Sequence, residues 1–185
     1  MRIVGGRFRG RAIAAPASRD IRPTADRLRE ALFNILVHGH DDPVTGARVI
    51  DLFAGTGALG LEAMSRGAAF ALFVDNGAEA RALLRRNVEA LGLGGATRIY
   101  RRDATALGQA HPHAPFTLAF CDPPYGKDLA RKALRSLREG GWLAPEAMVI
   151  VEEATASRFV APEGYAEIAR RAYDDTEFVI LRVAP

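Results

Sequence analysis

The chain has 185 residues, 49% of them hydrophobic and 25% charged, which is the composition of one ordinary globular domain with a full core. No apolar run approaches the ~20 residues of a membrane-spanning helix, and the amino end lacks the apolar stretch of a signal peptide. The single cysteine, Cys121, cannot form an internal disulfide, and no cluster of Cys and His has metal-ligand spacing. Membrane, disulfide-rich and metal-binding classes are therefore excluded, and we expect a cytoplasmic protein without a metal site.

Positive charge is concentrated at the amino end. The net charge is only +3, but residues 1–30 hold eight Arg and three acidic residues, so this segment carries +5 and the remainder −2. Of the basic residues 23 are Arg, the better bidentate reader of phosphate, and two are Lys. A basic arm of this kind is typical of nucleic-acid binding, although a preference for Arg can also reflect genome composition.

The first expected elements are short. The first twenty or so residues favour extended pieces separated by glycines and a proline, in which Arg7, Arg9 and Arg11 would share one face. A helix follows Pro23, with Thr24 as its N-cap. A polar loop is expected at residues 38–45.

Beyond residue 45 the pattern alternates. Strands are expected at residues 48–53, 69–74, 97–100, 116–121 and 147–151, helices at 58–66, 78–91 and 127–139, and a closing hairpin at 165–173 and 177–183. This order predicts an α/β fold of βαβ units with a mainly parallel sheet and an antiparallel hairpin at one edge. We expect residues 1–40 to form a basic extension packed on the main domain of residues 41–185.

A glycine pattern lies between the first expected strand and its helix. Gly55, Gly57 and Gly60 fit G-x-G-x-x-G, which lets the backbone approach a ligand at a helix amino end. Asp75 ends the second strand twenty residues after Gly55, where a carboxylate reaches ribose hydroxyls, and Asp103 follows the third strand, where it could contact an adenine amine. This set predicts an adenosine-containing ligand and leaves open a dinucleotide or S-adenosylmethionine; a turn kept for packing is the alternative.

The sequence Asp122-Pro123-Pro124-Tyr125 follows the apolar strand at residues 116–121. Two prolines stiffen the turn and leave carbonyl oxygens free to accept hydrogen bonds. Asp122 and the Pro123 carbonyl could accept the two hydrogens of an exocyclic amine, while Tyr125 offers a stacking face for a base. A nucleoside cofactor beside an amine-orienting turn predicts methyl transfer to nitrogen, which a dehydrogenase would not need.

These motifs and the amino end together resemble a known family along nearly the whole chain. The segments are residues 51–60 (DLFAGTGALG), 122–125 (DPPY), 1–11 (MRIVGGRFRGR), 21–30 (IRPTADRLRE) and 52–67. They resemble the RsmD family, the bacterial 16S rRNA (guanine(966)-N(2))-methyltransferases. The resemblance implies a Rossmann-like class I S-adenosylmethionine-dependent methyltransferase fold, with a mainly parallel seven-stranded sheet and a terminal antiparallel hairpin. It also implies S-adenosylmethionine as cofactor, and 16S rRNA within a small ribosomal subunit or an assembly intermediate as substrate. We expect the protein to act as a monomer and not to contact a membrane.

The candidate site residues form three sets. The catalytic set is Asp122, Pro123 and Tyr125. The cofactor set is Asp51, Phe53, Gly55, Thr56, Gly57, Gly60, Asp75, Asn76, Asp103 and Ala104. The RNA-binding set is Arg2, Arg7, Arg9, Arg11, Arg22, Thr24 and Arg27. The family commonly ends its second strand in Glu-x-Asp, whereas this chain has Asp75-Asn76-Gly77 and therefore a shorter acid.

Three other functions fit parts of the pattern. A DNA adenine-N6 methyltransferase shares the turn chemistry, but the chain has no room for a target-recognition region. A protein-glutamine methyltransferase generally carries Asn-Pro-Pro-Tyr, and a basic arm is less expected there. A non-catalytic RNA-binding module would not need the complete set of glycines and carboxylates.

Overall fold

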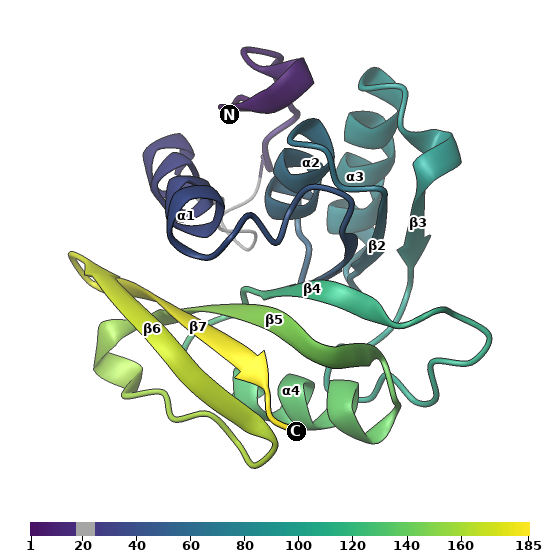
Figure 1. Ribbon diagram of the computed structural model, residues 1–185. Helices are drawn as coiled ribbons and strands as arrows, with labels where there is room; N and C mark the ends of the chain where they lie inside the picture. The colour runs from purple at the N-terminus through teal and green to yellow at the C-terminus, as the bar shows by residue number, and fades with distance from the viewer. Residues whose placement is uncertain (18–24) are drawn as a thin grey trace.

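The computed structural model describes residues 1–17 and 25–185. A seven-stranded sheet forms the centre of the molecule, and Figure 1 shows helices packed on it from both sides. The strand order is β3-β2-β1-β4-β5-β7-β6. The strands are β1 (Arg48–Leu52), β2 (Phe70–Val74), β3 (Thr97–Tyr100), β4 (Phe116–Cys121), β5 (Leu143–Ala154), β6 (Tyr165–Tyr173) and β7 (Thr176–Val183). Strands β1 to β5 pair parallel with one another, so their carboxyl ends meet at one edge of the sheet.

Helices cover both faces of this sheet. Helices α1 (Asp26–Gly39), α2 (Ala58–Ser65) and α3 (Ala78–Ala90) lie on one side, and α4 (Leu129–Glu139) lies on the other, as Figure 1 shows. The described residues also contain three short 3-10 helices, η1 (Gly6–Phe8), η2 (Gly94–Ala96) and η3 (Thr155–Ser157). Alternate residues of the central strands enter two separate apolar cores, one under each helical layer. The inner strands are therefore apolar throughout.

Most predicted elements are confirmed, and the differences lie at their ends. Strands β3 and β4 have the predicted bounds, whereas β5 extends well beyond residues 147–151 on both sides. Helix α4 begins at Leu129, two residues later than predicted, because Asp128 adopts a left-handed conformation with φ of 54°. Helix α1 continues through His38 and Gly39, so part of the predicted loop is helical.

The closing hairpin is confirmed, and its placement in the sheet is a finding of the structure. Strand β7 pairs antiparallel with both β5 and β6, so the last strand in the chain lies inside the sheet. Its residues from Thr176 to Leu181 are buried, whereas β6 is mostly exposed at the edge. The apolar run of β7 requires this inner place.

The amino-terminal arm differs from its prediction. It is a tight hairpin closed by a bridge between Arg2 and Ala12, and residues Gly6–Phe8 form a 3-10 turn. The expected extended segment with Arg7, Arg9 and Arg11 on one face is therefore wrong. The glycines that were expected to separate extended pieces instead adopt positive φ, 74° at Gly6 and 84° at Gly10, and allow the chain to fold back.

The start of α1 also differs. Ala25 occupies the N-cap position without a side-chain cap, so the cap lies one residue after Thr24, where the sequence predicts it, and the helix begins at Asp26. Thr24 and Arg22 lie outside the described residues. Ile3 and Ile13 of the arm, with Leu32 and Phe33 of α1, belong to the same core as the sheet. The division at residue 40 stays a prediction.

Candidate active site

A cavity opens at the carboxyl ends of β1, β2 and β4. Its volume is about 470 Å³, within the range of small-molecule sites. It brings together most of the predicted residues from three separate parts of the chain. They are Asp51, Phe53, Gly55, Thr56, Asp75, Asn76, Asp122, Pro123 and Tyr125.

The glycine loop after β1 forms one wall. Phe53 and Gly55 both have positive φ, 55° and 58°, so the backbone reverses sharply between the strand and α2. A positive φ in a non-glycine residue such as Phe53 costs free energy and is commonest at functional sites. The turn directs the loop backbone toward the cavity.

Gly57 and Gly60, which the sequence places in the cofactor set, do not line the cavity. A Cβ atom at Gly57 would lie 2.4 Å from a methyl carbon of Leu84, and one at Gly60 would lie 2.5 Å from the Phe73 ring. Gly57 is also the N-cap of α2, with φ of 82°. Their absent side chains allow α2 to pack tightly against β2 and α3 and so position the loop.

Asp51 is a buried carboxyl group at the floor of the cavity. Its Oδ2 accepts a hydrogen bond from the Gly60 N–H at 3.0 Å. Burial raises the pKa of Asp51 to about 8, and the nearby charge of Asp75 adds to this rise, while the Gly60 hydrogen bond opposes it. The group therefore binds a proton near neutral pH unless a positive charge comes close.

Asp75 organises the loop from the end of β2. Its Oδ2 accepts the Gly55 N–H at 2.9 Å, and its Oδ1 accepts the Gly77 N–H at 2.8 Å. Each carboxylate oxygen can accept a second hydrogen bond, so the group can hold the loop and still bind a ligand hydroxyl. Asn76 lies beside it in the cavity wall.

Two predicted cofactor residues are not among those lining the cavity. Asp103 is exposed after β3, and its Oδ1 accepts hydrogen bonds from the Thr105 N–H at 2.8 Å and the Thr105 hydroxyl at 2.7 Å. These bonds, the hydroxyl first, lower the pKa of Asp103. Ala104 is buried in the core beneath α4. Their contact with a cofactor stays a prediction.

The charge of the lining identifies the kind of ligand it favours. Of the described residues that line the cavity, four are acidic and none is basic; the acids are Asp51, Asp75, Glu79 and Asp122. A dinucleotide carries a pyrophosphate, which this lining would repel, whereas a cationic ligand would be attracted. The charge pattern favours a positively charged nucleoside ligand.

The Asp122–Tyr125 turn forms the opposite wall. Asp122 is half-buried, and its N–H points to the Leu52 carbonyl at 3.5 Å, which ties the turn to the end of β1. The Tyr125 hydroxyl lies 3.1 Å from the Thr176 hydroxyl at the start of β7. Thr176 therefore holds the Tyr125 side chain from the far end of the chain.

The neighbouring Cys121 is a core residue, as the sequence indicates. It is buried, and burial raises its thiol pKa well above the ordinary value, with the charge of Asp122 adding to the rise. A protonated buried thiol is a poor nucleophile. Among the described residues, no group of three or more His, Cys, Asp or Glu could hold a metal ion.

Several lining residues were not predicted. Those that share an apolar or small side chain are Ala54, Ala58, Leu59, Gly77, Ala78, Ala80 and Pro124, and Glu79 is the acidic one. Small side chains at the start of α3 carry no chemical signal by themselves. The position of residues 77–80 directly after Asp75-Asn76 could have predicted that they line the site, because ligands in α/β folds bind where the carboxyl end of a strand leads into the next helix.

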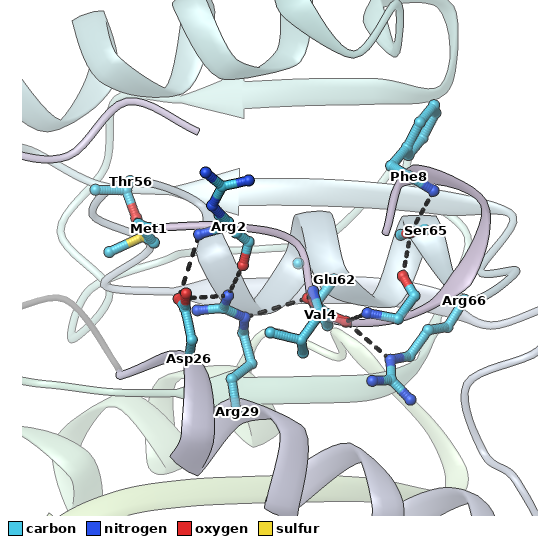
Figure 2. Close-up of polar contacts among 12 residues, drawn as sticks. Met1, Arg2, Val4, Phe8, Asp26, Arg29, Thr56, Glu62, Ser65 and Arg66 are labelled. Carbon is cyan, nitrogen blue, oxygen red and sulfur yellow. Dashed lines mark hydrogen bonds and ion pairs between the residues drawn. The ribbon is translucent and has the colours of Figure 1, made fainter. Parts of the chain in front are cut away.

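The amino-terminal arm is anchored beside this site by Glu62 of α2 (Figure 2). The Glu62 side chain is 0% exposed, and it accepts the backbone N–H groups of Val4 at 3.0 Å and Gly5 at 2.8 Å. It also pairs with the guanidinium groups of Arg29 at 3.2 Å and Arg66 at 2.9 Å. Figure 2 shows these donors converging on one carboxylate.

A second anchor ties the arm directly to the cofactor loop. The buried Asn87 of α3 accepts the Ala14 N–H at 2.6 Å through Oδ1, and its Nδ2 donates to the Thr56 carbonyl at 2.9 Å. Met1 lies next to Thr56 as well, with its sulfur 3.6 Å from the hydroxyl oxygen. The arm and the loop therefore share one structural unit.

The predicted RNA-binding arginines within the described residues are all exposed: Arg2, Arg7, Arg9, Arg11 and Arg27. The Arg7 guanidinium lies 4.6 Å from the centroid of the Phe8 ring, and Arg11 donates to the Ala90 carbonyl at 2.6 Å. Arg29, one of the eight arginines of the basic segment, is instead fully buried and pairs with Asp26 and Glu62. Basic residues in this segment therefore have two different roles.

The chain matches known proteins over most of its length. The family model described as conserved hypothetical protein 95 matches residues 1–182. The Escherichia coli (strain K12) protein named ribosomal RNA small subunit methyltransferase D is 40% identical over 152 residues, covering 82% of this chain and 74% of that protein. The Haemophilus influenzae protein of the same name is 33% identical over 167 residues, covering 89% and 84%.

Solved structures agree. The Escherichia coli yhhF protein has a TM-score of 0.82 at 32% identity and covers 99% of this chain and 97% of its own. A ribosomal protein L11 methylase from Lactobacillus delbrueckii subsp. bulgaricus has a TM-score of 0.68 at 14% identity, covering 92% and 90%, which shows the fold alone. The Rossmann-like class I methyltransferase fold predicted from the sequence is confirmed. The chain belongs to the family of ribosomal RNA small subunit methyltransferase D, the RsmD family.

Proposed function

We propose that this protein transfers a methyl group from S-adenosylmethionine to the exocyclic N2 amine of a guanine in small-subunit ribosomal RNA. The observation that carries the proposal is the acid-lined cavity, which joins the glycine loop to the Asp122-Pro123-Pro124-Tyr125 turn. The names of the Escherichia coli and Haemophilus influenzae relatives support rRNA as the substrate class.

The residues of the cavity fit the cofactor. S-adenosylmethionine supplies an electrophilic methyl group on a sulfonium, and no metal is needed for its transfer. Asp51 and Asp75 lie where negative charge would hold a cationic ligand and ribose hydroxyls, and the loop backbone at Gly55 approaches closely because it has no side chain. The apolar residues Ala54, Leu59 and Ala78 offer a surface for the flat base.

The turn at Asp122 orients the nucleophile. The lone pair of an aryl amine is delocalised into its ring, so the amine must be turned before it can attack. Asp122 and the Pro123 carbonyl would each accept one N–H, which directs the lone pair toward the methyl carbon. As the nitrogen–carbon bond forms, the sulfur–methyl bond would break and its electron pair would stay on sulfur. Asp122 would stabilise the positive charge that develops on the nitrogen, and the surplus proton would leave the amine during or after transfer.

Tyr125 would stack on the target base, a contact worth about 1–3 kcal/mol. Its hydroxyl is held by Thr176, so the ring is oriented before the base arrives. The guanine must be unpaired or flipped out of a helix to reach this turn.

Asp122→Ala should abolish turnover while S-adenosylmethionine binding, measured by calorimetry, changes little. Asp122→Asn should keep part of the activity, because its carbonyl oxygen still accepts one amine hydrogen. Glu139→Ala, an exposed change at the far end of α4, is the control and should behave as the parent protein. Near-normal turnover in the Asp122→Ala protein would contradict the assignment.

The substrate can be identified directly. The protein is incubated with labelled S-adenosylmethionine and either undermethylated small subunits, free rRNA, or DNA, and the product is digested and mapped by mass spectrometry. We expect N2-methylguanine at one position of the rRNA. Methyl groups on adenine N6, on DNA or on protein would replace this proposal with one of the alternatives.

We also propose that the protein acts as a monomer in the cytoplasm on a small subunit or an assembly intermediate. Among the described residues, only Val160 and Ile168 are large apolar side chains with substantial exposure, so no extended apolar face invites self-association. No helix in the described part of the chain is long and apolar enough to cross a membrane. Sedimentation of the free protein tests its monomeric state.

A further inference from the structure

A second cavity lies next to the Asp122–Tyr125 turn. Its volume is about 280 Å³, and its lining begins at Gly126, the residue that directly follows Tyr125. The other lining residues come from the start of α4, the end of β5 and the turn after it: Asp128, Ala130, Arg131, Glu153, Ser157, Arg158, Phe159 and Val160. No residue of the RNA-binding set predicted from the sequence belongs to it.

The topology places this cavity beside the proposed reaction site. Strands β4 and β5 are parallel, with Cys121 opposite Val151, so the turns that follow them lie at the same edge of the sheet. The first cavity occupies the ends of β2, β1 and β4, and the second occupies the ends of β4 and β5. A strand that presents one base at Tyr125 would therefore pass over the second cavity next.

The second cavity differs from the first in its charge. It contains two guanidinium groups, those of Arg131 and Arg158, whereas the first contains no basic group among its described lining residues. The Nε of Arg131 is buried and has no hydrogen-bond partner within residues 1–17 and 25–185. The buried Nε cannot itself reach a ligand in the cavity, but the two guanidinium groups place positive charge at its wall, where an anionic ligand would be attracted.

The remaining groups limit the kind of anion. Asp128 and Glu153 also line the cavity, and burial raises the pKa of Glu153, with Asp128 and Glu177 contributing. A free phosphate would gain little beside two acids, but a nucleotide has both a phosphate for the guanidinium groups and N–H or O–H groups for the carboxylates. Ala130, Phe159 and Val160 add an apolar wall of the kind that borders a base or a ribose.

We propose that this second cavity binds the nucleotide adjacent to the target guanine in the substrate RNA strand, with its phosphodiester held by Arg131 and Arg158. The inference rests on the proposed function and deepens it. Holding the neighbouring phosphate fixes the register of the strand, so that only one base can enter the Asp122 turn. Arg131 and Arg158 are thus RNA-positioning residues outside the amino-terminal arm.

The kinetic test compares Arg131→Gln/Arg158→Gln with Arg135→Gln, an exposed arginine one turn further along α4. Methylation of undermethylated small subunits is measured as kcat and KM, and S-adenosylmethionine binding is measured by calorimetry. The double variant should raise KM for the subunit at least about tenfold, with unchanged cofactor affinity. Each lost phosphate contact should also decrease the slope of the logarithm of the RNA-binding constant against the logarithm of salt concentration by about 0.7 in magnitude. The Arg135→Gln protein should match the parent in every measurement.

An unchanged KM in the folded double variant would overturn the inference while leaving the methyl-transfer proposal intact. If the double variant does not fold, Arg158→Gln alone carries the test, because Arg158 is exposed in the turn after β5. Failure of the parent protein to methylate rRNA guanine is a separate result, and it would remove the proposed function itself.

A crosslinking experiment identifies the occupant. Val160 is 68% exposed at the rim of the cavity and can be replaced by a photo-crosslinking amino acid. We expect an adduct on rRNA within about two nucleotides of the methylated guanine. An adduct only on a ribosomal protein, or on distant rRNA, would show that this cavity does not bind the neighbouring nucleotide.

Discussion

At the scale of single residues, Asp51 is the least ordinary group in the molecule. It is a carboxyl group buried on β1, and it accepts a hydrogen bond from the Gly60 N–H. Burial raises the pKa of Asp51 to about 8 in the folded chain, well above the ordinary value of an aspartate, so the folded state holds the proton more tightly than the unfolded state. A residue with this environment links stability and ligand charge to pH.

The sign of the linkage gives a prediction. The stabilisation that Asp51 gives is complete below about pH 4 and is lost as pH rises toward 8, because the unfolded chain releases the proton first. Asp51→Asn keeps an oxygen for Gly60 but has no proton to lose. The free energy of unfolding of this variant relative to the parent should therefore increase between pH 5 and 8. The gain is at most about 1.4 kcal/mol per pH unit.

Urea unfolding of both proteins at pH 5 and pH 8 measures this difference. Parallel pH dependence in the two proteins would show that Asp51 titrates as an ordinary exposed carboxylate.

The glycines of the G-x-G-x-x-G pattern do not all have the same role. The pattern correctly marks the loop, but Gly57 and Gly60 are required by the Leu84 and Phe73 side chains that approach them. A sequence pattern cannot distinguish a glycine that admits a ligand from one that admits a neighbouring side chain.

At the scale of elements, the central relation is between the arm and α2. Helix α2 starts at the cofactor loop and carries Glu62, which binds the backbone of Val4 and Gly5 and the buried Arg29 of α1. Ser65, one turn later, donates to the Gly5 carbonyl at 2.6 Å and accepts the Phe8 N–H at 3.0 Å. The arm that we expect to bind RNA is therefore hydrogen-bonded to α2, the helix that follows the cofactor loop.

Glu62→Gln should detach this arm. Loss of the charge removes the fully buried carboxylate partner of Arg29 and leaves it beside the partly exposed Asp26, which costs up to about 3–5 kcal/mol. Amide hydrogen exchange of Val4 and Gly5 should accelerate more than exchange in the sheet. The matched control is Glu167→Gln in the exposed pair with Arg170 on β6, where the loss should stay below about 1 kcal/mol. Unchanged exchange at Val4 and Gly5 would mean that the Glu62 contacts do not hold the arm.

At the scale of the whole molecule, the charges separate into two kinds of surface. The charged residues that line the first cavity are all acidic, whereas exposed arginines lie on the arm, and Arg131 and Arg158 border the second cavity. Such a distribution suits a cationic cofactor and an anionic polymer bound at the same time.

Replacing Arg7, Arg9 and Arg11 together by Gln should weaken RNA binding. The slope of the logarithm of the binding constant against the logarithm of salt concentration should also decrease in magnitude by up to about 2, because each phosphate contact contributes about 0.7 for single strands. Cofactor affinity should be preserved. The control changes three exposed arginines elsewhere, Arg135, Arg171 and Arg182. Equal RNA affinity and equal salt slopes in the two triple variants would show that the arm carries only solvated charge.

The sequence by itself determined the alternation of strands and helices, the two motifs and their order along the chain. Each of these depends on local causes: side-chain periodicity, glycine and proline dihedral preferences, and the place of a polar residue after an apolar strand. For this reason β3 and β4 have the predicted bounds, and Asp122 lies at a strand end as expected. The family resemblance depended on the same local segments.

Only the tertiary structure decided which arginines are exposed to a ligand and where β7 lies in the sheet. Arg29 cannot be told from Arg27 by its neighbours in the chain, because its partner Glu62 is 33 residues away and both charges are buried together. The inner position of β7, the role of Thr176 at Tyr125 and the second cavity between β4 and β5 likewise arise from contacts between distant segments. Burial and pairing of charge are long-range properties, so no local pattern records them.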